Sequence, residues 1–198
     1  MDGMDGPGRL VHAVHPLPPS PARLPSAARR RHSSRRHAKL SSVMKITIIG
    51  DGAMATVSAG LLAANGHALR LWSPFPEAVA ALRANRENTR YLPGVAFPED
   101  TAFTDDEADA FDGAQLVLAA TPTQYIRATW GRLAPHCPAG IPIVSVAKGI
   151  ENGTLLRPTQ VLRDVLGDGR PLAALSGPNI ARELAEHLPA TATVAAEN

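Results

Sequence analysis

A strand-like run leads directly into a glycine turn at residue 50 of this 198-residue chain. Lys45–Ile49 is rich in β-branched residues, which is typical of a buried parallel strand. Gly50–Ala55 follows at once and has the spacing G-x-G-x-x-A, and Ala53–Asn65 has the composition of an apolar helix that Gly66 would end. This order of strand, turn and helix indicates an α/β architecture in which helices connect parallel strands.

The turn carries the small residues that a bound dinucleotide requires. Gly50 permits a tight strand-to-helix turn, Gly52 lets a pyrophosphate approach the backbone, and Ala55 allows close helix–strand packing. Ala53 and Met54 stand at the helix N-terminus, where backbone amides and the helix dipole favour phosphate. We therefore expect these five residues to contact NAD or NADP, since the turn lies between a strand and a helix.

The turn after the next expected strand, Ala68–Trp72, does not decide between NAD and NADP. NAD-specific sites usually carry an acid here, which binds the adenosine ribose. In this chain Ser73 and Pro74 follow the strand and Glu77 comes slightly late, while no arginine is present in the turn to hold a 2′-phosphate. We expect Pro74 to contact the cofactor, and the choice between NAD and NADP stays open.

Strands and helices alternate through the rest of the chain. The remaining expected strands are Leu116–Ala120, Ile141–Val146 and Pro171–Leu175, and the remaining expected helices are Glu77–Arg86, Gln124–Leu133 and Leu155–Leu166. This alternation implies βαβ units and a doubly wound, mostly parallel sheet with helices on both faces, which is a Rossmann-type α/β fold. We assign residues 44–198 to this domain.

Residues 1–43 differ from the rest in composition. They hold eight Lys or Arg against two acids, a net charge of +6, whereas the remaining residues have a net charge of −4. Rich in Pro, Arg and Ser, they predict a disordered basic tail. It could be an arm for nucleic acid or an anionic surface, which we disfavour, or a targeting peptide with the Arg and Ser content of a transit peptide. We favour a start assigned too early, because Met44 directly precedes the first strand.

The single cysteine, Cys137, cannot form an internal disulfide, and no apolar run approaches the roughly 18 residues of a membrane span. These features favour a cytoplasmic protein. His67, His136 and His187 have no metal-ligand spacing, so we expect no metal site.

Several segments, in chain order, resemble the NAD(P)-dependent glycerol-3-phosphate dehydrogenases. They are Gly50–Ala55, Asn88–Gly94, Ala120–Gln124, Ala147–Glu151 and Leu175–Ala181. The last two are the most specific, because they recur together in few other Rossmann families. Tyr91–Gly94 is expected to be a packed turn at the entrance. The resemblance spans residues 44–198 and implies reduction of dihydroxyacetone phosphate to sn-glycerol 3-phosphate, for phospholipid synthesis.

Lys148 is the candidate catalytic residue. It follows an expected strand, and ligands of open α/β sheets bind beyond the carboxyl ends of strands. An ammonium there attracts a phosphorylated substrate and polarises its oxygens. The resemblance implies that Lys148 contacts both the substrate and the cofactor.

The segment after the last expected strand offers amides, a hydroxyl and a side-chain amide to a ligand. The resemblance implies that Gly177 and Asn179 line the substrate site and that Ala181 lies against the cofactor. Family members often have Ser or Thr at the position of Asn179, although an Asn side chain can also donate a hydrogen bond. A plain helix N-cap formed by Ser176 or Asn179 is the alternative.

The family's second domain is helical and carries another lysine, the general acid/base on the C2 oxygen. No Lys follows Lys148, so we expect that lysine and the arginine that grips the substrate phosphate to be missing. We expect dinucleotide binding with little or no turnover, since loss of acid/base assistance costs about 10²–10⁴-fold in rate. A homodimer is left open for the full-length enzyme. The alternatives are a non-catalytic dinucleotide-binding module and a related reductase such as a ketopantoate reductase, against which Lys148–Glu151 and Ser176–Pro178 argue.

Overall fold

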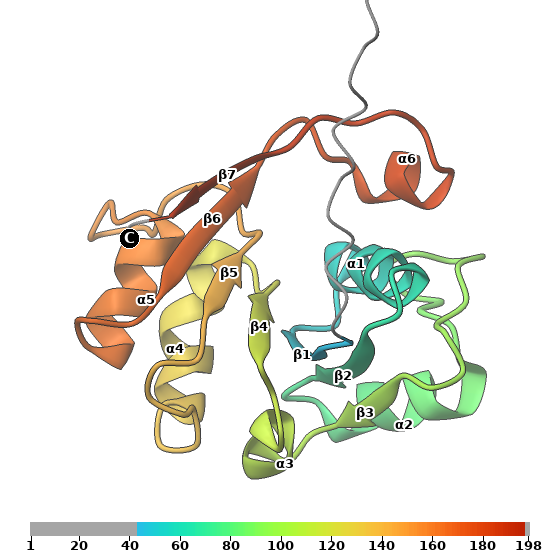
Figure 1. Cartoon of the computed structure of the whole chain (residues 1–198), viewed down its shortest axis with the longest axis horizontal. Coiled ribbons are helices and arrows are strands. Elements are labelled where there is room, and N and C mark those ends of the chain that lie inside the picture. Colours follow the sequence, from blue (N-terminus) through green and yellow to red (C-terminus); the bar gives the residue numbers. More distant parts are fainter. Residues whose placement is uncertain (1–42, 197–198) are drawn as a thin grey trace, which may run out of the picture. The chain divides into compact units, whose positions relative to one another are not determined.

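The computed structural model describes residues 43–196, so the tail predicted for residues 1–43 lies almost wholly outside the described part. The strands are β1 (Lys45–Ile49), β2 (Ala68–Trp72), β3 (Ala102–Thr104), β4 (Leu116–Ala119), β5 (Ile143–Ser145), β6 (Leu172–Ser176) and β7 (Thr193–Ala196). They form one sheet in the order β3-β2-β1-β4-β5-β6-β7 (Figure 1). Strands β1 to β6 pair in parallel and β7 pairs antiparallel with β6, which confirms the predicted mostly parallel sheet.

Helices cover both faces of this sheet. They are α1 (Ala53–Ala64), α2 (Pro76–Asn85), α3 (Glu107–Phe111), α4 (Thr123–Leu133), α5 (Pro158–Leu166) and α6 (Ala181–Ala185). Helices α1 and α2 pack on one face and α3, α4 and α5 on the other, while α6 lies beside α1 (Figure 1). The doubly wound Rossmann-type fold is therefore confirmed. No helix within residues 43–196 is long and apolar enough to cross a membrane.

Strand β1 shows how the sequence fills two cores at once. Ile46 and Ile48 point to the face covered by α1 and α2, whereas Ile49 belongs to the core under α4. Thr47 also faces that second side, where its hydroxyl donates a hydrogen bond of 2.6 Å to the carbonyl oxygen of Ala110. A strand buried on both faces must be apolar almost throughout, which is why Lys45–Ile49 lacks simple alternation.

The strand order reverses between β1 and β4. From β1 the chain proceeds outward to β2 and β3, and from β4 it proceeds the other way to β5 and β6. Because these strands are parallel, their carboxyl ends lie along one edge of the sheet. Ligands of open α/β sheets bind at such a reversal.

The boundaries of several elements differ from expectation. The helix expected from Leu155 begins only at Pro158, which stands in its first turn, because Leu155 has a left-handed backbone with φ of 57°. Strand β5 begins after Pro142, whose missing amide prevents it from donating to a neighbouring strand. The elements β3, α3 and β7 were not expected, since each has only three to five residues, whereas a helix after Asn179 was expected and is present as α6.

Candidate functional site

Gly50 is required by the close approach of two chain segments. Its φ is +120°, and a Cβ there would lie 3.0 Å from the carbonyl oxygen of Ala120. Its amide donates a hydrogen bond of 2.9 Å to Trp72, and the amide of Ala120 donates one of 2.9 Å to Ile49. The turn is thus fixed by both strands that flank β1.

Gly52 opens the N-terminus of α1 to a ligand. It is the N-cap residue, and a Cβ added to it would meet no atom within 4 Å. No side chain of the described residues caps the helix. Ala53 and Met54 follow in the uncapped first turn, and Ala55 is fully buried against the sheet. Unpaired amides beside open space fit the phosphates of a dinucleotide.

A cavity of about 300 Å³ lies beside this turn, at the carboxyl ends of β1, β2 and β4. Its lining consists of Gly50, Asp51, Gly52, Trp72, Pro74, Phe75, Tyr91, Ala120, Thr121, Pro122, Tyr125 and Thr129. Phe75, Tyr91 and Tyr125 are 49%, 45% and 64% exposed, so three aromatic rings are available to a flat ligand.

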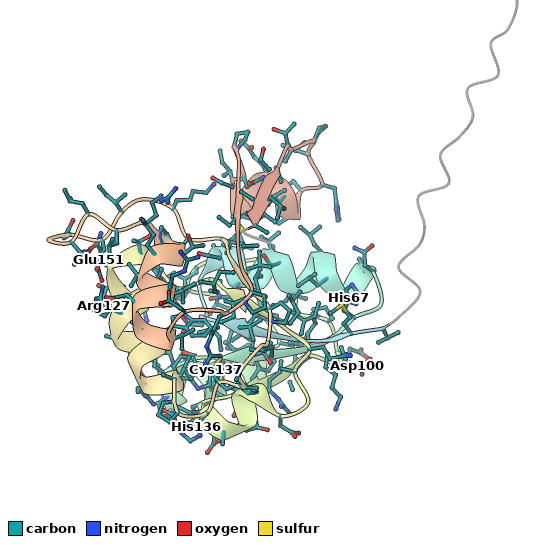
Figure 2. The ribbon with its side chains drawn as sticks, turned by 60° about the vertical axis from the view of Figure 1, so that its left-hand side comes forward. His67, Asp100, Arg127, His136, Cys137 and Glu151 are labelled. Atoms are coloured by element: carbon teal, nitrogen blue, oxygen red, sulfur yellow. The ribbon has the colours of Figure 1, made fainter. Side chains whose placement is uncertain are left out.

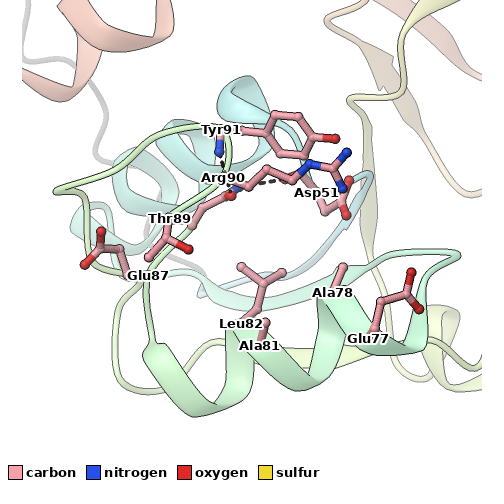
Figure 3. A pocket seen from close by; sticks show the side chains of 10 residues that line it. Asp51, Glu77, Ala78, Ala81, Leu82, Glu87, Thr89, Arg90 and Tyr91 are labelled. Atoms are coloured by element: carbon pink, nitrogen blue, oxygen red, sulfur yellow. Dashed lines mark hydrogen bonds between the residues drawn. The ribbon is translucent and has the colours of Figure 1, made fainter.

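Buried Asn88 fixes the neighbouring segment to the dinucleotide turn. Its Nδ2 donates to the carbonyl oxygen of Asp51 at 2.7 Å and to the Thr56 hydroxyl at 2.8 Å, and its Oδ1 accepts from the amide of Tyr91 at 3.1 Å. Tyr91 and Asp51 also line a smaller cavity of about 140 Å³, whose opposite wall is helix α2 (Figure 3). Residues Tyr91–Gly94 form a turn in which Leu92 is buried, as expected, and Tyr91 lines both cavities.

Lys148 lies beyond the carboxyl end of β5, and its side chain is exposed. Its Nζ donates a hydrogen bond of 2.6 Å to the carbonyl oxygen of Gly177, which follows β6. Lys148 also lines a mainly apolar cavity of about 270 Å³, together with Met54 and Asn179. The structure therefore brings together three predicted residues from three separate segments.

The turn at Gly177 is crossed by a later part of the chain. Gly177 has φ of +148°, and a Cβ there would lie 2.4 Å from the carbonyl oxygen of Thr191. Asn179 donates to that same oxygen at 3.0 Å, while its Oδ1 is buried with no partner among the described residues. The N-cap of α6 is Ile180, without a side-chain cap, so the alternative in which Ser176 or Asn179 caps the helix is wrong.

The segment that carries Lys148 contains a buried carboxylate. Glu151 is 7% exposed, and both its oxygens accept hydrogen bonds from Arg127, at 3.0 and 2.9 Å. These bonds, and one from the Thr154 hydroxyl, hold the pKa of Glu151 below its usual range, although burial acts against them. Glu151 is therefore an anchor for the segment and not a proton donor near neutral pH.

Sequence reasoning missed part of the cavity lining. Tyr125 and Thr129 stand four residues apart on α4 and so face the same side, a spacing that was visible in the sequence. Phe75 lines the cavity from the turn after β2, beside the expected Pro74. Of the predicted residues, Ala53, Ala55, Gly177 and Ala181 line neither the 300 Å³ nor the 270 Å³ cavity.

The remaining titratable candidates lie apart from these cavities. Cys137 is buried beside Arg170, and burial raises the pKa of its thiol. Among the described residues, no three His, Cys, Asp or Glu side chains are grouped to hold a metal ion.

Comparison with known proteins gives a match over nearly all of the described residues. The family model of the NAD-dependent glycerol-3-phosphate dehydrogenase N-terminus matches residues 45–198. A glycerol-3-phosphate dehydrogenase, NAD(P)+, of Citrifermentans bemidjiense is 42% identical over 156 residues, which are 78% of this chain and 47% of that protein. The enzyme of the same name from Myxococcus xanthus is 40% identical over 154 residues, 77% of this chain and 46% of that protein.

Solved structures agree with this match. The glycerol-3-phosphate dehydrogenase of Coxiella burnetii superposes with a TM-score of 0.73 at 31% identity, over 79% of this chain and 47% of that one. The enzyme from Saccharomyces cerevisiae has a TM-score of 0.70 at 24% identity, over 79% and 48% of the two chains, which supports the fold alone. The chain thus spans about half the length of the relatives it matches.

Proposed function

This chain belongs to the NAD-dependent glycerol-3-phosphate dehydrogenase family, and from that premise we propose that it binds NAD or NADP for the reduction of dihydroxyacetone phosphate to sn-glycerol 3-phosphate. The observation that carries the proposal is the uncapped N-terminus of α1 with open space at Gly52, located where the strand order reverses. The family membership also decides against the ketopantoate reductase alternative.

The proposed cofactor site follows the carboxyl edge of the sheet. The amides of Gly52, Ala53 and Met54 bind the pyrophosphate, while Gly50 and Ala55 keep the turn and the helix in place. Pro74 and the 300 Å³ cavity would hold the adenosine end, because the ribose of such cofactors is bound after the second strand. Lys148 and Ala181 would hold the nicotinamide end.

The proposed substrate site is the surface between Lys148, Gly177 and Asn179. The ammonium of Lys148 attracts the phosphorylated substrate and polarises its carbonyl oxygen. The Oδ1 of Asn179, which is buried without a partner among the described residues, would accept a hydrogen bond from a substrate hydroxyl once that atom is uncovered. When bound, the nicotinamide supplies the hydride.

Calorimetry on the 198-residue protein tests the proposal. NADH and NADPH are each titrated with and without dihydroxyacetone phosphate, and the stronger binder gives the cofactor preference. Binding that becomes tighter with dihydroxyacetone phosphate supports the dehydrogenase site. Dinucleotide affinity that does not change with dihydroxyacetone phosphate favours the non-catalytic module. If neither dinucleotide binds, both proposed functions are contradicted.

Two further expectations stay predictions about the whole protein. One is a cytoplasmic location, and the other is a homodimer of the full-length enzyme. A role in phospholipid synthesis is likewise proposed, because sn-glycerol 3-phosphate is the product of the proposed reduction.

A further inference from the structure

Helix α4 binds the backbone of the segment from Lys148 to Asn152, called here the lysine loop. The hydroxyl of Thr123 donates a hydrogen bond of 2.7 Å to the carbonyl oxygen of Lys148. Gln124 donates to the carbonyl oxygen of Ile150 at 2.8 Å and accepts from the amide of Asn152 at 2.9 Å. Two side chains in the first turn of α4 therefore hold three backbone groups of the lysine loop.

A third residue of α4 holds the loop through a charge. Arg127 lies beside Glu151 (Figure 2) and forms hydrogen bonds to both of its oxygens. It forms a further bond of 2.6 Å to Asp164 of α5. A buried carboxylate is costly unless it is paired and hydrogen-bonded, so the Arg127 partner fixes where Glu151 can lie. The lysine loop is thus tied to two helices.

Lys148 is consequently held both at its backbone and at the end of its side chain. Its carbonyl oxygen is bound by Thr123, and its Nζ reaches the carbonyl oxygen of Gly177. Gly149 follows with φ of +97°, a backbone conformation that directs the chain away immediately after the lysine. A shift of the loop backbone would therefore move the ammonium away from Gly177.

The residues of α4 that contact the lysine loop do not line the 300 Å³ cavity. Tyr125 and Thr129 of the same helix line the 300 Å³ cavity, whereas Thr123, Gln124 and Arg127 do not. Substitution at these three positions can therefore change the loop without removing a side chain from that cavity.

We propose that Thr123, Gln124 and Arg127 are positioning residues that place the Lys148 ammonium beside Gly177. They touch neither the proposed cofactor nor the proposed substrate, and act through the backbone and carboxylate of the lysine loop. The importance of this placement for substrate binding rests on the proposed function, but the placement itself can be measured without any ligand.

The chain offers a direct probe, because it contains only three lysines, Lys39, Lys45 and Lys148. The full 198-residue protein is treated with limiting acetic anhydride, and the acetylation rate of each lysine is measured by mass spectrometry, with Lys45 as the internal reference. In Thr123→Val the relative rate at Lys148 should rise about threefold to tenfold, the factor that corresponds to one net hydrogen bond. Thr123→Ser keeps the hydroxyl and should restore the wild-type rate.

A matched control and a second variant complete the experiment. Thr101 is a buried threonine whose hydroxyl has no partner in the described part of the chain, so Thr101→Val should leave the Lys148 rate unchanged. Gln124→Met keeps the side-chain length but removes two hydrogen bonds, and it should act like Thr123→Val. Circular dichroism of each variant verifies the fold.

Two results would overturn the positioning role. One is an unchanged Lys148 rate in both Thr123→Val and Gln124→Met with the fold intact, and the other is an equal rise in Thr123→Ser and Thr123→Val. Failure of the wild type to bind any dinucleotide would instead contradict the proposed function, since the acetylation assay contains no ligand.

Discussion

The Nζ of Lys148 donates a hydrogen bond of 2.6 Å to the carbonyl oxygen of Gly177, and this bond joins the turn after β5 to the turn after β6. A carbonyl oxygen is a neutral acceptor. An anionic phosphate forms a stronger, charge-assisted hydrogen bond with an ammonium. A phosphorylated ligand within reach of Lys148 would therefore replace the Gly177 carbonyl oxygen as the hydrogen-bond acceptor of the ammonium.

Lys148→Met should abolish the effect of dihydroxyacetone phosphate on dinucleotide affinity while leaving the fold intact. The exposed methionine keeps the length of the side chain but removes the charge that attracts the phosphate. Lys148→Arg keeps the charge and should retain part of the effect, since a planar guanidinium does not replace a compact ammonium. Calorimetric titration of both variants provides the measurement, and an undiminished effect in Lys148→Met would contradict the proposed substrate site.

Alanine substitutions at Gly50 and Gly52 should have opposite signatures. At Gly50 the methyl group meets the Ala120 carbonyl, and the positive φ adds strain of about 1–3 kcal/mol, so thermal stability should fall. At Gly52 the backbone suits any residue and the methyl group enters open space, so stability should hold. Dinucleotide affinity should nevertheless fall in Gly52→Ala by about tenfold or more, or 1.4 kcal/mol, because the methyl group occupies the path of the pyrophosphate.

Melting temperatures and dinucleotide titrations of the two variants separate these effects. If Gly52→Ala bound dinucleotide as tightly as the wild type, the pyrophosphate would not lie against this turn.

Asn88→Ala should lower both stability and dinucleotide affinity. It leaves the carbonyl oxygen of Asp51 and the amide of Tyr91 without their partner. Both groups are partly buried, so the cost is at most the roughly 1–3 kcal/mol of a fully buried unsatisfied group. The Tyr91 ring should then lose its fixed place in the cavity. Urea denaturation measures the first effect and calorimetry the second. Thr89→Ala, in the same segment, is the control, and an equal response to both substitutions would argue against a specific role of Asn88.

The ion pair of Glu151 should make stability depend on acid pH. The folded state lowers the pKa of this carboxyl from its ordinary value of 4.5, chiefly through Arg127. Its contribution to stability is therefore complete above about pH 5 and is lost as the pH falls through the lowered pKa. Glu151→Gln should melt below the wild type at pH 7, and the gap should narrow progressively below pH 4.5. A gap that stayed constant down to pH 3 would show that the charge is not the cause.

Much of the fold could be predicted because strong local signals agree with the global arrangement. A β-branched run that ends in a glycine turn specifies β1, and short apolar runs specify its neighbours β2 and β4. These strands are buried on both faces. Strand β7 lacks such a signal, since all four of its residues are exposed and, within residues 43–196, it pairs only with β6 at the edge of the sheet. Its pairing depends on the chain returning past Gly177, which is a long-range contact that no local pattern encodes.

The site could be predicted where function depends on the backbone and less well where it depends on side chains brought from elsewhere. Gly50 and Gly52 can be recognised from the sequence, because the geometry of the turn requires glycine at residue 50 and the approach of a pyrophosphate favours it at residue 52. Tyr91 and Tyr125 reach one cavity from segments 34 residues apart, and a tyrosine in a turn or on a helix is by itself no sign of a binding site. The contacts of Arg127 could not be predicted from the sequence either, because its partners Glu151 and Asp164 belong to a loop and another helix.

The packing of Gly50 against Ala120 has a consequence for the thermodynamics of binding. Hydrogen bonds from Gly50 to Trp72 and from Ala120 to Ile49 hold this turn, so its shape is set by the protein's own strands. A ligand that meets such a preorganised backbone does not have to order it. The gain from each phosphate–amide contact is then not offset by lost conformational entropy of the chain, and a small number of backbone donors suffices for useful affinity.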